Sequence, residues 1–184
     1  MKKILMTLVA VAMATTMNAQ TWIGGELGFS SSHVNGEKNT NKQFFVSPEI
    51  GYNLDDNLSV AIKLGYEHSS VLKIEDQLLE NVNAYTINPY VRYAFVKAGN
   101  FSAFIDGGIF YTTAHFKDSD NNYNQFGAAV TPGIAYAVSD KVTLVSHLGD
   151  GLYYNHEWIK DLTHANNFGF NFLNSISFGA YYNF

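Results

Sequence analysis

Hydrophobic and polar residues alternate at every second position between residues 44 and 67. The apolar members of the first half of this stretch are Phe44, Val46, Pro48, Ile50, Tyr52 and Leu54. The alternation resumes after the turn residues 55–57 and continues from Leu58 to Tyr66. Because the side chains of a β-strand point to opposite faces in turn, this pattern predicts a hairpin of two strands that share one apolar face.

The same unit recurs at an interval of about 42 residues, which indicates an internal repeat. Residues 48–52 (PEIGY) are echoed by residues 89–93 (PYVRY), 132–136 (PGIAY) and 178–182 (FGAYY). The alternation predicts strands at residues 23–29, 44–54, 58–66, 85–95, 101–111, 126–138, 142–152 and 170–184. The sequence therefore predicts an all-β fold, an eight-stranded antiparallel up-and-down barrel.

The polar face of these strands is rich in Gly, Ala and Ser and carries few charges. A β-sandwich or a lipocalin-like barrel would also alternate, with its apolar face inward. Small residues with scattered charge suit a narrow lumen better than a solvent-facing surface, which normally carries many Lys and Glu. We therefore expect the apolar face to point outward and the lumen to hold a charge network of Glu26, Glu49, Lys63, Arg92, Asp106 and His147.

Aromatic residues on the apolar face form two groups, one near each end of the strands. The group near the short turns is Tyr52, Tyr93, Tyr136 and Tyr182, and the group near the far end is Phe29, Phe44, Tyr66, Tyr85, Tyr111, Phe126 and Phe172. Eight residue steps from Tyr85 to Tyr93, at about 3.3 Å each and a tilt of about 40°, span roughly 20 Å along the barrel axis. An outer-membrane barrel has an apolar band of about 25 Å. These aromatic girdles therefore predict a transmembrane barrel.

Long and short connections alternate along the chain. The long ones are residues 30–43, 68–84, 112–125 and 153–167, and the short ones are residues 55–57, 96–100 and 139–141. Outer-membrane barrels have long extracellular loops and short periplasmic turns. With an even number of strands, both ends of the mature chain are expected on the periplasmic side. Ser146 and Asp150 interrupt the apolar face of the seventh strand and predict a weaker wall there.

Residues 1–19 are typical of a secretory signal peptide, with Lys2 and Lys3 before an apolar run. That run is shorter than the roughly 20 apolar residues of a membrane-spanning helix. We therefore expect a signal peptide at residues 1–19 and a barrel at residues 20–184. The chain has no Cys for a disulfide framework or a lipid anchor. Its formal net charge of −5, more negative without the two lysines, argues against nucleic acid as a partner.

The hairpin sequence resembles the repeated hairpin of the eight-stranded outer-membrane β-barrel domain of the Bacteroidetes type, among the small OmpA-, OmpX- and OmpW-like barrels. The residues that carry the resemblance are Ser47-Pro48-Glu49-Ile50-Gly51-Tyr52 and Asp56-Asn57-Leu58-Ser59-Val60. The end of the chain, with Tyr182 and Phe184, is similar to the terminal signal by which such barrels are recognised for assembly. The resemblance covers the mature chain and implies two partners, outer-membrane lipid and the barrel assembly machinery.

The sequence contains no phosphate-binding loop, nucleophile elbow or metalloprotease motif, and we expect no cofactor and no metal site. Histidines fall in or beside the predicted long connections at His33, His68, His115, His156 and His164. His68 and Ser70 share a strand face, which is similar to the His and Ser of lipid A deacylase barrels. The neighbouring Glu67 points to the opposite face, so His68 and Ser70 are weak catalytic candidates.

An eight-stranded barrel is about filled by its own side chains, so a general porin channel is not expected. The sequence favours a non-enzymatic barrel whose extracellular loops mediate surface interaction or envelope integrity, through contacts with extracellular protein or lipopolysaccharide. Two alternatives stay open: OmpW-like passage of small hydrophobic molecules by a lateral opening, and lipid A-modifying hydrolysis. Apolar residues on both sides of residues 75–77 favour a self-packed or lipid-touching loop, and the less favoured alternative is a hairpin that extends beyond the membrane and pairs with another protein.

Overall fold

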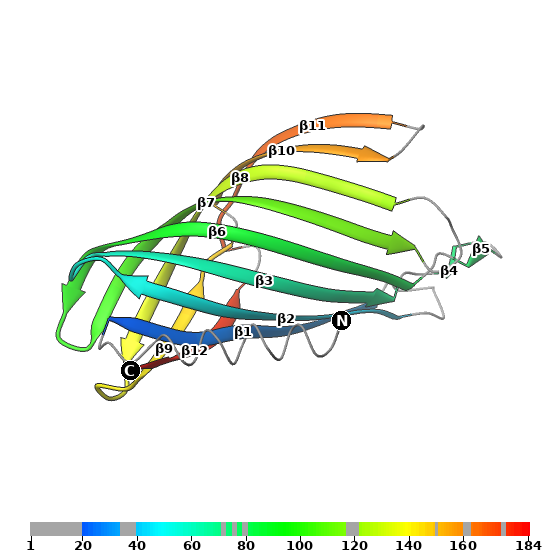
Figure 1. Ribbon diagram of the computed structural model, residues 1–184. Helices are drawn as coiled ribbons and strands as arrows, with labels where there is room; N and C mark the ends of the chain where they lie inside the picture. The colour runs from blue at the N-terminus through cyan, green and yellow to red at the C-terminus, as the bar shows by residue number, and fades with distance from the viewer. Residues whose placement is uncertain are drawn as a thin grey trace, which may run out of the picture.

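The chain forms an all-β barrel in the computed structural model, which describes residues 20–33, 40–70, 73–74, 77–78, 81–116, 122–149, 151–159, 163–173 and 176–184 (Figure 1). The strands are β1 (Thr21–His33), β2 (Thr40–Asn53), β3 (Leu58–Ser70), β4 (Lys73–Ile74), β5 (Gln77–Leu78), β6 (Asn81–Ala98), β7 (Phe101–Phe116), β8 (Asn122–Ala137), β9 (Val142–His147), β10 (Gly151–Ile159), β11 (Thr163–Asn171) and β12 (Ser177–Asn183). The predicted fold class, an antiparallel barrel of eight strands, is confirmed.

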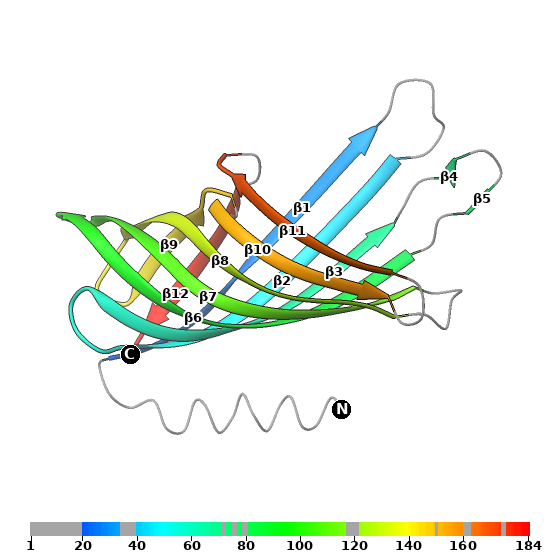
Figure 2. The same cartoon turned by 90° about the horizontal axis from the view of Figure 1, so that it is seen from above.

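The barrel closes where the first and last strands meet. β1 pairs with β2 on one side and with β12 on the other, and β9 pairs with both β12 and β8. The complete ring consists of β1, β2, β3, β6, β7, β8, β9 and β12 (Figures 1 and 2). We call this half of the barrel, with its short connections 54–57, 99–100 and 138–141, the turn end. The opposite half, where β1, β3, β7 and β10 end, is the loop end.

The register of the β2–β3 hairpin agrees with the alternation. A three-residue turn at residues 55–57 predicts Tyr52 opposite Val60, Gly51 opposite Ala61, and Glu49 opposite Lys63, and the structure has this register. The predicted turn at residues 96–100 would leave Arg92 two strand positions from Asp106, but the two residues lie directly opposite each other on β6 and β7. The turn is tighter, at residues 99–100, and a β-bulge between Ala94 and Val96 then shifts the register by one residue, and the two differences together set the charges opposite each other.

The seventh and eighth predicted strands are not continuous, which corrects the prediction. The seventh divides into β9 and β10 after His147, and the eighth divides into β11 and β12. Gly149 and Gly151 adopt φ angles of 90° and 59°, which end the extended backbone, and Leu173 does so with φ of 61°. Alternation of side chains carries no signal for such φ angles. The interruption follows Ser146, where the sequence predicted a weaker wall.

The predicted fourth long loop, residues 153–167, is wrong because most of it forms the β10–β11 ladder. Polar residues such as Asn155, Glu157 and Asn167 make this segment read as a loop, but each holds a ladder position. The strands at the other loop-end connections are also longer than predicted. The second connection contains the short β4–β5 ladder between Lys73–Ile74 and Gln77–Leu78, which forms a separate two-stranded sheet.

Large apolar side chains cover the outside of the barrel, as expected. Leu27, Tyr85, Ile109 and Phe178 are each at least half exposed. The buried core lies instead in the lumen and is made of Trp22, Tyr90, Phe104, Val145 and Tyr181. No helix in the described ranges is long and apolar enough to cross a membrane.

The wall at the loop end has an unpaired seam. β8 pairs with β9 near the turn end and with β10 near the loop end, so the strand order ends in β10 and β11. Within the part of the chain that the structure describes, β11 pairs only with β10, and residues 28–33 of β1 pair only with β2. Among the described strands, the barrel is therefore closed at the turn end, and β11 and β1 do not pair with each other at the loop end.

Candidate functional site

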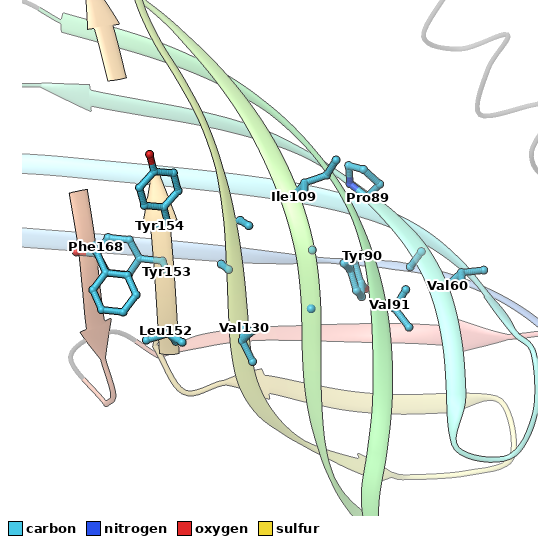
Figure 3. A pocket seen from close by; sticks show the side chains of 15 residues that line it. Val60, Pro89, Tyr90, Val91, Ile109, Val130, Leu152, Tyr153, Tyr154 and Phe168 are labelled. Atoms are coloured by element: carbon cyan, nitrogen blue, oxygen red, sulfur yellow. The ribbon is translucent and has the colours of Figure 1, made fainter. Parts of the chain in front are cut away.

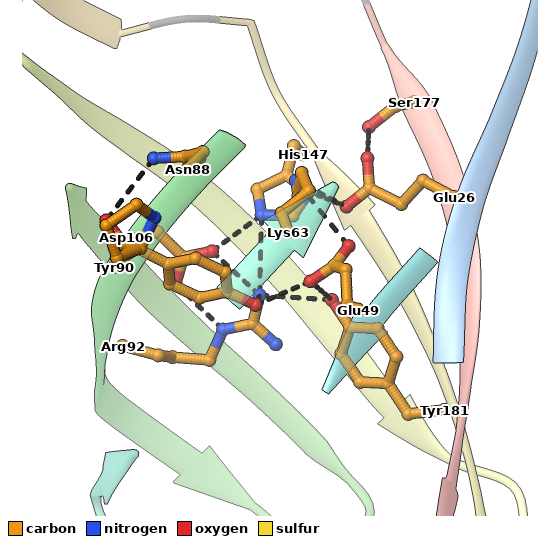
Figure 4. Close-up of polar contacts among 11 residues, drawn as sticks. Glu26, Glu49, Lys63, Asn88, Tyr90, Arg92, Asp106, His147, Ser177 and Tyr181 are labelled. Atoms are coloured by element: carbon orange, nitrogen blue, oxygen red, sulfur yellow. Dashed lines mark hydrogen bonds and ion pairs between the residues drawn. The ribbon is translucent and has the colours of Figure 1, made fainter. Parts of the chain in front are cut away.

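Six charged or titratable side chains meet in the lumen at the turn end (Figure 4). They are Glu26, Glu49, Lys63, Arg92, Asp106 and His147, the set that the sequence predicted to face the lumen. They come from six different strands and are at most 8% exposed, except for Lys63, whose side chain is 20% exposed. Burying a charge is costly unless it is paired, so the geometry of the pairing decides whether this cluster is stable.

Arg92 forms the centre of the cluster. Its Nε and Nη2 donate to Oδ1 and Oδ2 of Asp106, each at 2.7 Å, in a bidentate pair. The same Nη2 also donates to the hydroxyl of Tyr181 at 3.1 Å. The guanidinium lies 4.0 Å from the ring centre of Phe104 and within 5.6 Å of those of Tyr90, Tyr181 and Trp22. Arg92 is thus enclosed by aromatic faces, which favour a cation.

His147 bridges two carboxylates. Its Nε2 lies 2.8 Å from Oδ2 of Asp106, and its Nδ1 lies 2.5 Å from Oε1 of Glu26. A carboxylate oxygen thus lies beside each ring nitrogen, but only the contact of Nε2 with Asp106 has hydrogen-bond geometry, and Nη2 of Arg92 also lies 3.4 Å from Nε2. A protonated His147 would set three cations against the three carboxylates of the cluster.

Glu49 and Lys63 complete the cluster. Lys63 Nζ lies 3.5 Å from Glu49 Oε1 and 3.3 Å from Glu26 Oε1. The other oxygen of Glu49 accepts from the hydroxyl of Tyr90 at 2.5 Å and from that of Tyr181 at 3.2 Å. These contacts join opposite walls of the barrel. Together with the stacked rings of Trp22 and Tyr181, whose centres are 4.2 Å apart, the cluster fills the turn-end half of the lumen. We call this assembly the lumen plug.

Sequence reasoning missed the roles of Tyr90, Tyr181 and Ser177. Alternation assigns all three to the lumen face, but it does not show that the tyrosine hydroxyls reach Glu49 or that Ser177 Oγ donates to Glu26 Oε2 at 2.6 Å. Ser177 and Glu26 are 151 residues apart in the chain. Such pairs become neighbours only when the last strand closes on the first, and the strand pattern alone does not fix that closure.

The residues of the predicted aromatic girdles lie as follows. At the turn end, Tyr52, Tyr93, Tyr136 and Tyr182 are exposed on the outward face. At the loop end the strand register pairs Phe29 with Phe44, Tyr66 with Tyr85, and Tyr111 with Phe126. The prediction places Phe172 in the loop-end girdle, but it follows the last residue of β11, at the end of that strand away from the loop end. The prediction treated residues 170–184 as one continuous strand, and the break between β11 and β12 makes that assumption wrong.

Tyr182 and Phe184, the predicted assembly signal, lie at the seam that closes the barrel. The backbone N–H of Phe184 donates to the carbonyl oxygen of Thr21 at 3.1 Å, and the Tyr182 and Phe184 rings are 5.3 Å apart. The last strand is therefore tied to the first up to its final residue.

Tyrosine, histidine and asparagine side chains form clusters on the outward face at the loop end. On β3 and β6, Tyr66 Oη and His68 Nδ1 lie 3.0 and 2.9 Å from Oδ1 of Asn83. On β10 and β11, Tyr154 Oη and His156 Nδ1 lie 3.1 and 2.8 Å from Oδ1 of Asn166. No group of three or more His, Cys, Asp or Glu side chains among the described residues is arranged to hold a metal ion.

The catalytic candidates His68 and Ser70 do not gain an acid partner among the described residues. The Nδ1 of His68 contacts the Asn83 amide, and the carboxylate of Glu67 accepts from Gln43 at 2.8 Å. The side chain of Ser70 lies outside the described set. This geometry does not assemble the oriented base that a serine nucleophile needs.

The family model for the outer membrane protein beta-barrel domain matches residues 4–184 of the chain. Among solved structures, the chain is similar to the outer membrane protein OprG from Pseudomonas aeruginosa (15% identity, TM-score 0.53, covering 92% of this chain and 98% of OprG). It is also similar to outer membrane protein W of E. coli (18% identity, TM-score 0.51, 92% and 100% covered). The Neisserial surface protein A is similar as well (18% identity, TM-score 0.50, 89% and 95% covered). No curated protein matches the sequence. At these identities, the structural likeness shows the fold.

Proposed function

Because the chain belongs to the family of outer-membrane protein β-barrel domains, we propose that it is a non-enzymatic barrel without a through-channel whose loop end faces the cell exterior. In this proposal the extracellular connections make surface contacts, with extracellular protein or lipopolysaccharide, or support the integrity of the envelope. The observation that carries the proposal is the lumen plug, which occupies the turn-end half of the only fully closed ring of described strands.

The plug supports the absence of a channel because it joins the walls through buried, paired groups. Arg92 contacts Asp106 on the adjacent strand and Tyr181 on β12, and Glu49 on β2 accepts from Tyr90 and Tyr181. Opening a path would break these charge-assisted bonds and leave charges unpaired in a narrow space, at a cost of about 3 to 5 kcal/mol for a buried pair.

The proposed orientation follows from the connections and the chain ends. The short connections at the turn end suit the periplasm, and the longer loop end suits the exterior. Both ends of the mature chain would then be periplasmic, after removal of residues 1–19 as a signal peptide. The closing contact of Phe184 with Thr21 supports a role for the last strand in insertion by the barrel assembly machinery.

Conductance across planar bilayers tests this proposal. We expect no steady current from the purified barrel. The double variant Glu49→Ala, Arg92→Ala, which removes the centre of the plug, should give small steps, since two large lumen side chains are lost. As a matched control, Lys97→Ala with Lys141→Ala removes two exposed side chains at the turn end and should stay silent. Large, ordered steps from the unchanged protein would contradict the proposal.

A second candidate function is the lateral passage of small hydrophobic molecules between the loop end and the bilayer. The observation that favours it is the seam at the loop end, where described residues of β11 and residues 28–33 of β1 have no pairing with each other. A molecule that enters the loop-end half of the lumen would meet the plug below it and the seam beside it. The seam would then lead into the hydrocarbon of the membrane.

Uptake of an apolar fluorescent dye into vesicles that carry lipopolysaccharide in the outer leaflet tests the second candidate. The barrel should speed uptake several-fold over protein-free vesicles. Ala165→Arg places a charge on β11 at the seam and should return the rate to the protein-free value. Ala98→Arg places the same charge at the turn end of β6 and should not change it. Equal rates with and without protein would exclude lateral passage.

A further inference from the structure

An apolar groove with a volume of about 730 Å³ crosses the outward face of the barrel from β3 to β11 (Figure 3). Its floor on β7 and β8 is made of small residues, including Gly107 and Ala128. A Cβ atom built on Gly107 would meet no other atom within 4 Å, so the space above the floor is open. Larger side chains rise on both sides, with Val91 of β6 on one side and Tyr154 of β10 on the other. The volume falls within the range of ligand pockets, about 300 to 1,000 Å³.

A β-bulge lies at the β10 edge of the groove. Gly151 and Leu152 both lie opposite Val130, which forms a β-bulge where β10 begins. A bulge bends the strand that carries it, and the outward side chains of β10 and β11 are thereby set at an angle to those of β7 and β8. Phe168 on β11, 72% exposed, stands at this edge of the groove.

A polar cluster lies at the β10 end of the groove. Tyr154, which lines the groove, donates its hydroxyl to Asn166 Oδ1, and His156 Nδ1 lies 2.8 Å from the same oxygen. An amide oxygen only accepts, so Nδ1 carries the proton, and no hydrogen bond among the described residues uses Nε2 of His156. The His156 ring stacks on that of His164, 5.8 Å away, and on that of Trp158, 5.6 Å away.

The register sets this cluster at the height of the loop-end girdle. His156 lies opposite Phe126, a girdle residue, whereas Tyr154 lies opposite Ala128 in the groove floor. In an outer-membrane barrel the girdle marks the boundary between hydrocarbon and headgroups, where Trp and Tyr are enriched. The groove therefore faces hydrocarbon, and the His156 cluster faces the headgroup layer.

We propose that the groove holds an acyl chain of a membrane lipid and that His156, with His164 beside it, binds the phosphate of that lipid's headgroup. The groove is continuous with the membrane-facing surface of the barrel, so an acyl chain is the apolar ligand always present there. With Nδ1 bonded to Asn166, Nε2 can share a proton with a phosphate oxygen. The inference rests on the membrane location of the barrel and is independent of the lumen plug and the seam.

Native mass spectrometry of the purified barrel, titrated in detergent with dimyristoyl phosphatidic acid, tests the proposal. We expect Ala128→Phe, which fills the groove floor, and His156→Leu, which removes the phosphate ligand, each to weaken binding about tenfold. Two matched controls should stay within about twofold of the unchanged protein. Ala180→Phe changes another exposed, outward-facing alanine, on β12, and His68→Leu removes the histidine of the β3–β6 cluster, which does not line the groove.

Two further ligands show whether the site binds the phosphate of a lipid or free phosphate. Dimyristoylglycerol, which lacks the phosphate, should bind about tenfold more weakly than phosphatidic acid, and inorganic phosphate at the same concentration should not displace the lipid. Equal weakening by all four variants, equal binding of dimyristoylglycerol, or displacement by inorganic phosphate alone would overturn the proposal. Should Ala128→Phe fail to fold, Gly107→Leu fills the same floor and carries the same expectation. None of these variants changes the lumen plug, so all of them should show no steady conductance. A failure of the lipid-binding proposal can therefore be told apart from a failure of the proposed function.

Discussion

Lys63 on β3 lies directly opposite Glu49 on β2, with its Nζ 3.5 Å from Glu49 Oε1, and the ammonium also reaches Glu26 Oε1 at 3.3 Å. The Glu49 side chain is fully buried, but the Lys63 side chain is 20% exposed. Water therefore reaches one partner, and the pair is worth less than a fully buried one. One ammonium serves two carboxylates, which links the walls formed by β1, β2 and β3.

A double-mutant cycle with Glu49→Gln and Lys63→Met should give a coupling energy of about 1 to 2 kcal/mol, below the roughly 3 to 5 kcal/mol lost when a fully buried pair is broken. The free energy of unfolding is measured with urea in lipid vesicles. The control cycle combines Lys63→Met with Glu157→Gln on β10, which does not contact Lys63, and should give zero coupling within error. Zero coupling in the first cycle would mean that Glu49 and Lys63 do not interact.

Replacing Arg92 should cost more. Arg92→Met leaves Asp106 without its bidentate partner, so we expect a loss of about 3 kcal/mol in the free energy of unfolding. Arg92→Lys keeps the charge but loses the two parallel bonds and the stacking on Phe104, and about half of that loss is expected. Lys97→Met, on an exposed lysine at the end of the same strand, should change stability by less than about 0.5 kcal/mol. A similar loss for Arg92→Met and Lys97→Met would contradict the central role of Arg92.

The parts of this barrel that the sequence predicts are local. Alternation determines which face each residue occupies, and a short turn determines the register of its hairpin, so the pairing of Glu49 with Lys63 follows from the sequence alone. The next hairpin already departs from this reasoning, because its turn is tighter than predicted and a bulge in β6 adds one residue, which together set Arg92 directly opposite Asp106.

Contacts across the lumen depend on closure, which the sequence does not specify. Glu49 accepts a hydrogen bond from Tyr181, which is 132 residues away in the chain. The two meet only because β12 pairs with β1 in one particular register. The seam could not be predicted for a different reason. It follows from the breaks at Gly149, Gly151 and Leu173, where the backbone turns to positive φ without a change in the side-chain pattern. A glycine within a strand can adopt either a negative or a positive φ, so its presence alone does not predict a break.

Packing around Phe104 should make Gly133 intolerant of a methyl group. A Cβ on Gly133 would lie 2.3 Å from the Phe104 ring and 2.9 Å from a backbone oxygen of Ser146. Phe104 is only 2% exposed and stacks beneath Arg92, so it has little room to move. We expect Gly133→Ala to lower the free energy of unfolding by about 1 to 3 kcal/mol. The matched change Gly107→Ala meets no atom within 4 Å and should leave it unchanged or slightly raised. Equal stability of the two variants would show that the Phe104 site is loosely packed.

The last residue of the chain should matter for assembly. Phe184 hydrogen-bonds through its backbone to Thr21, beside the register of β12 with β1, and its ring packs near Tyr182 on the outward face. Deleting Phe184 removes the final closing bond and the terminal aromatic together, so we expect a several-fold lower yield of folded barrel. Folding is read from heat-modifiable migration, in which the folded protein runs faster than the boiled one.

Two comparisons separate the causes of this effect. Phe184→Ser keeps the backbone bond to Thr21, so a yield as low as that of the deletion would assign the effect to the aromatic side chain as an assembly signal. Deleting one of residues 117–121, which join β7 to β8 in the chain, shortens the chain equally, and connections between strands tolerate changes in length. That variant should assemble as well as the unchanged protein. Equal yields from the Phe184 deletion and the loop deletion would contradict a role of Phe184 in closing the barrel.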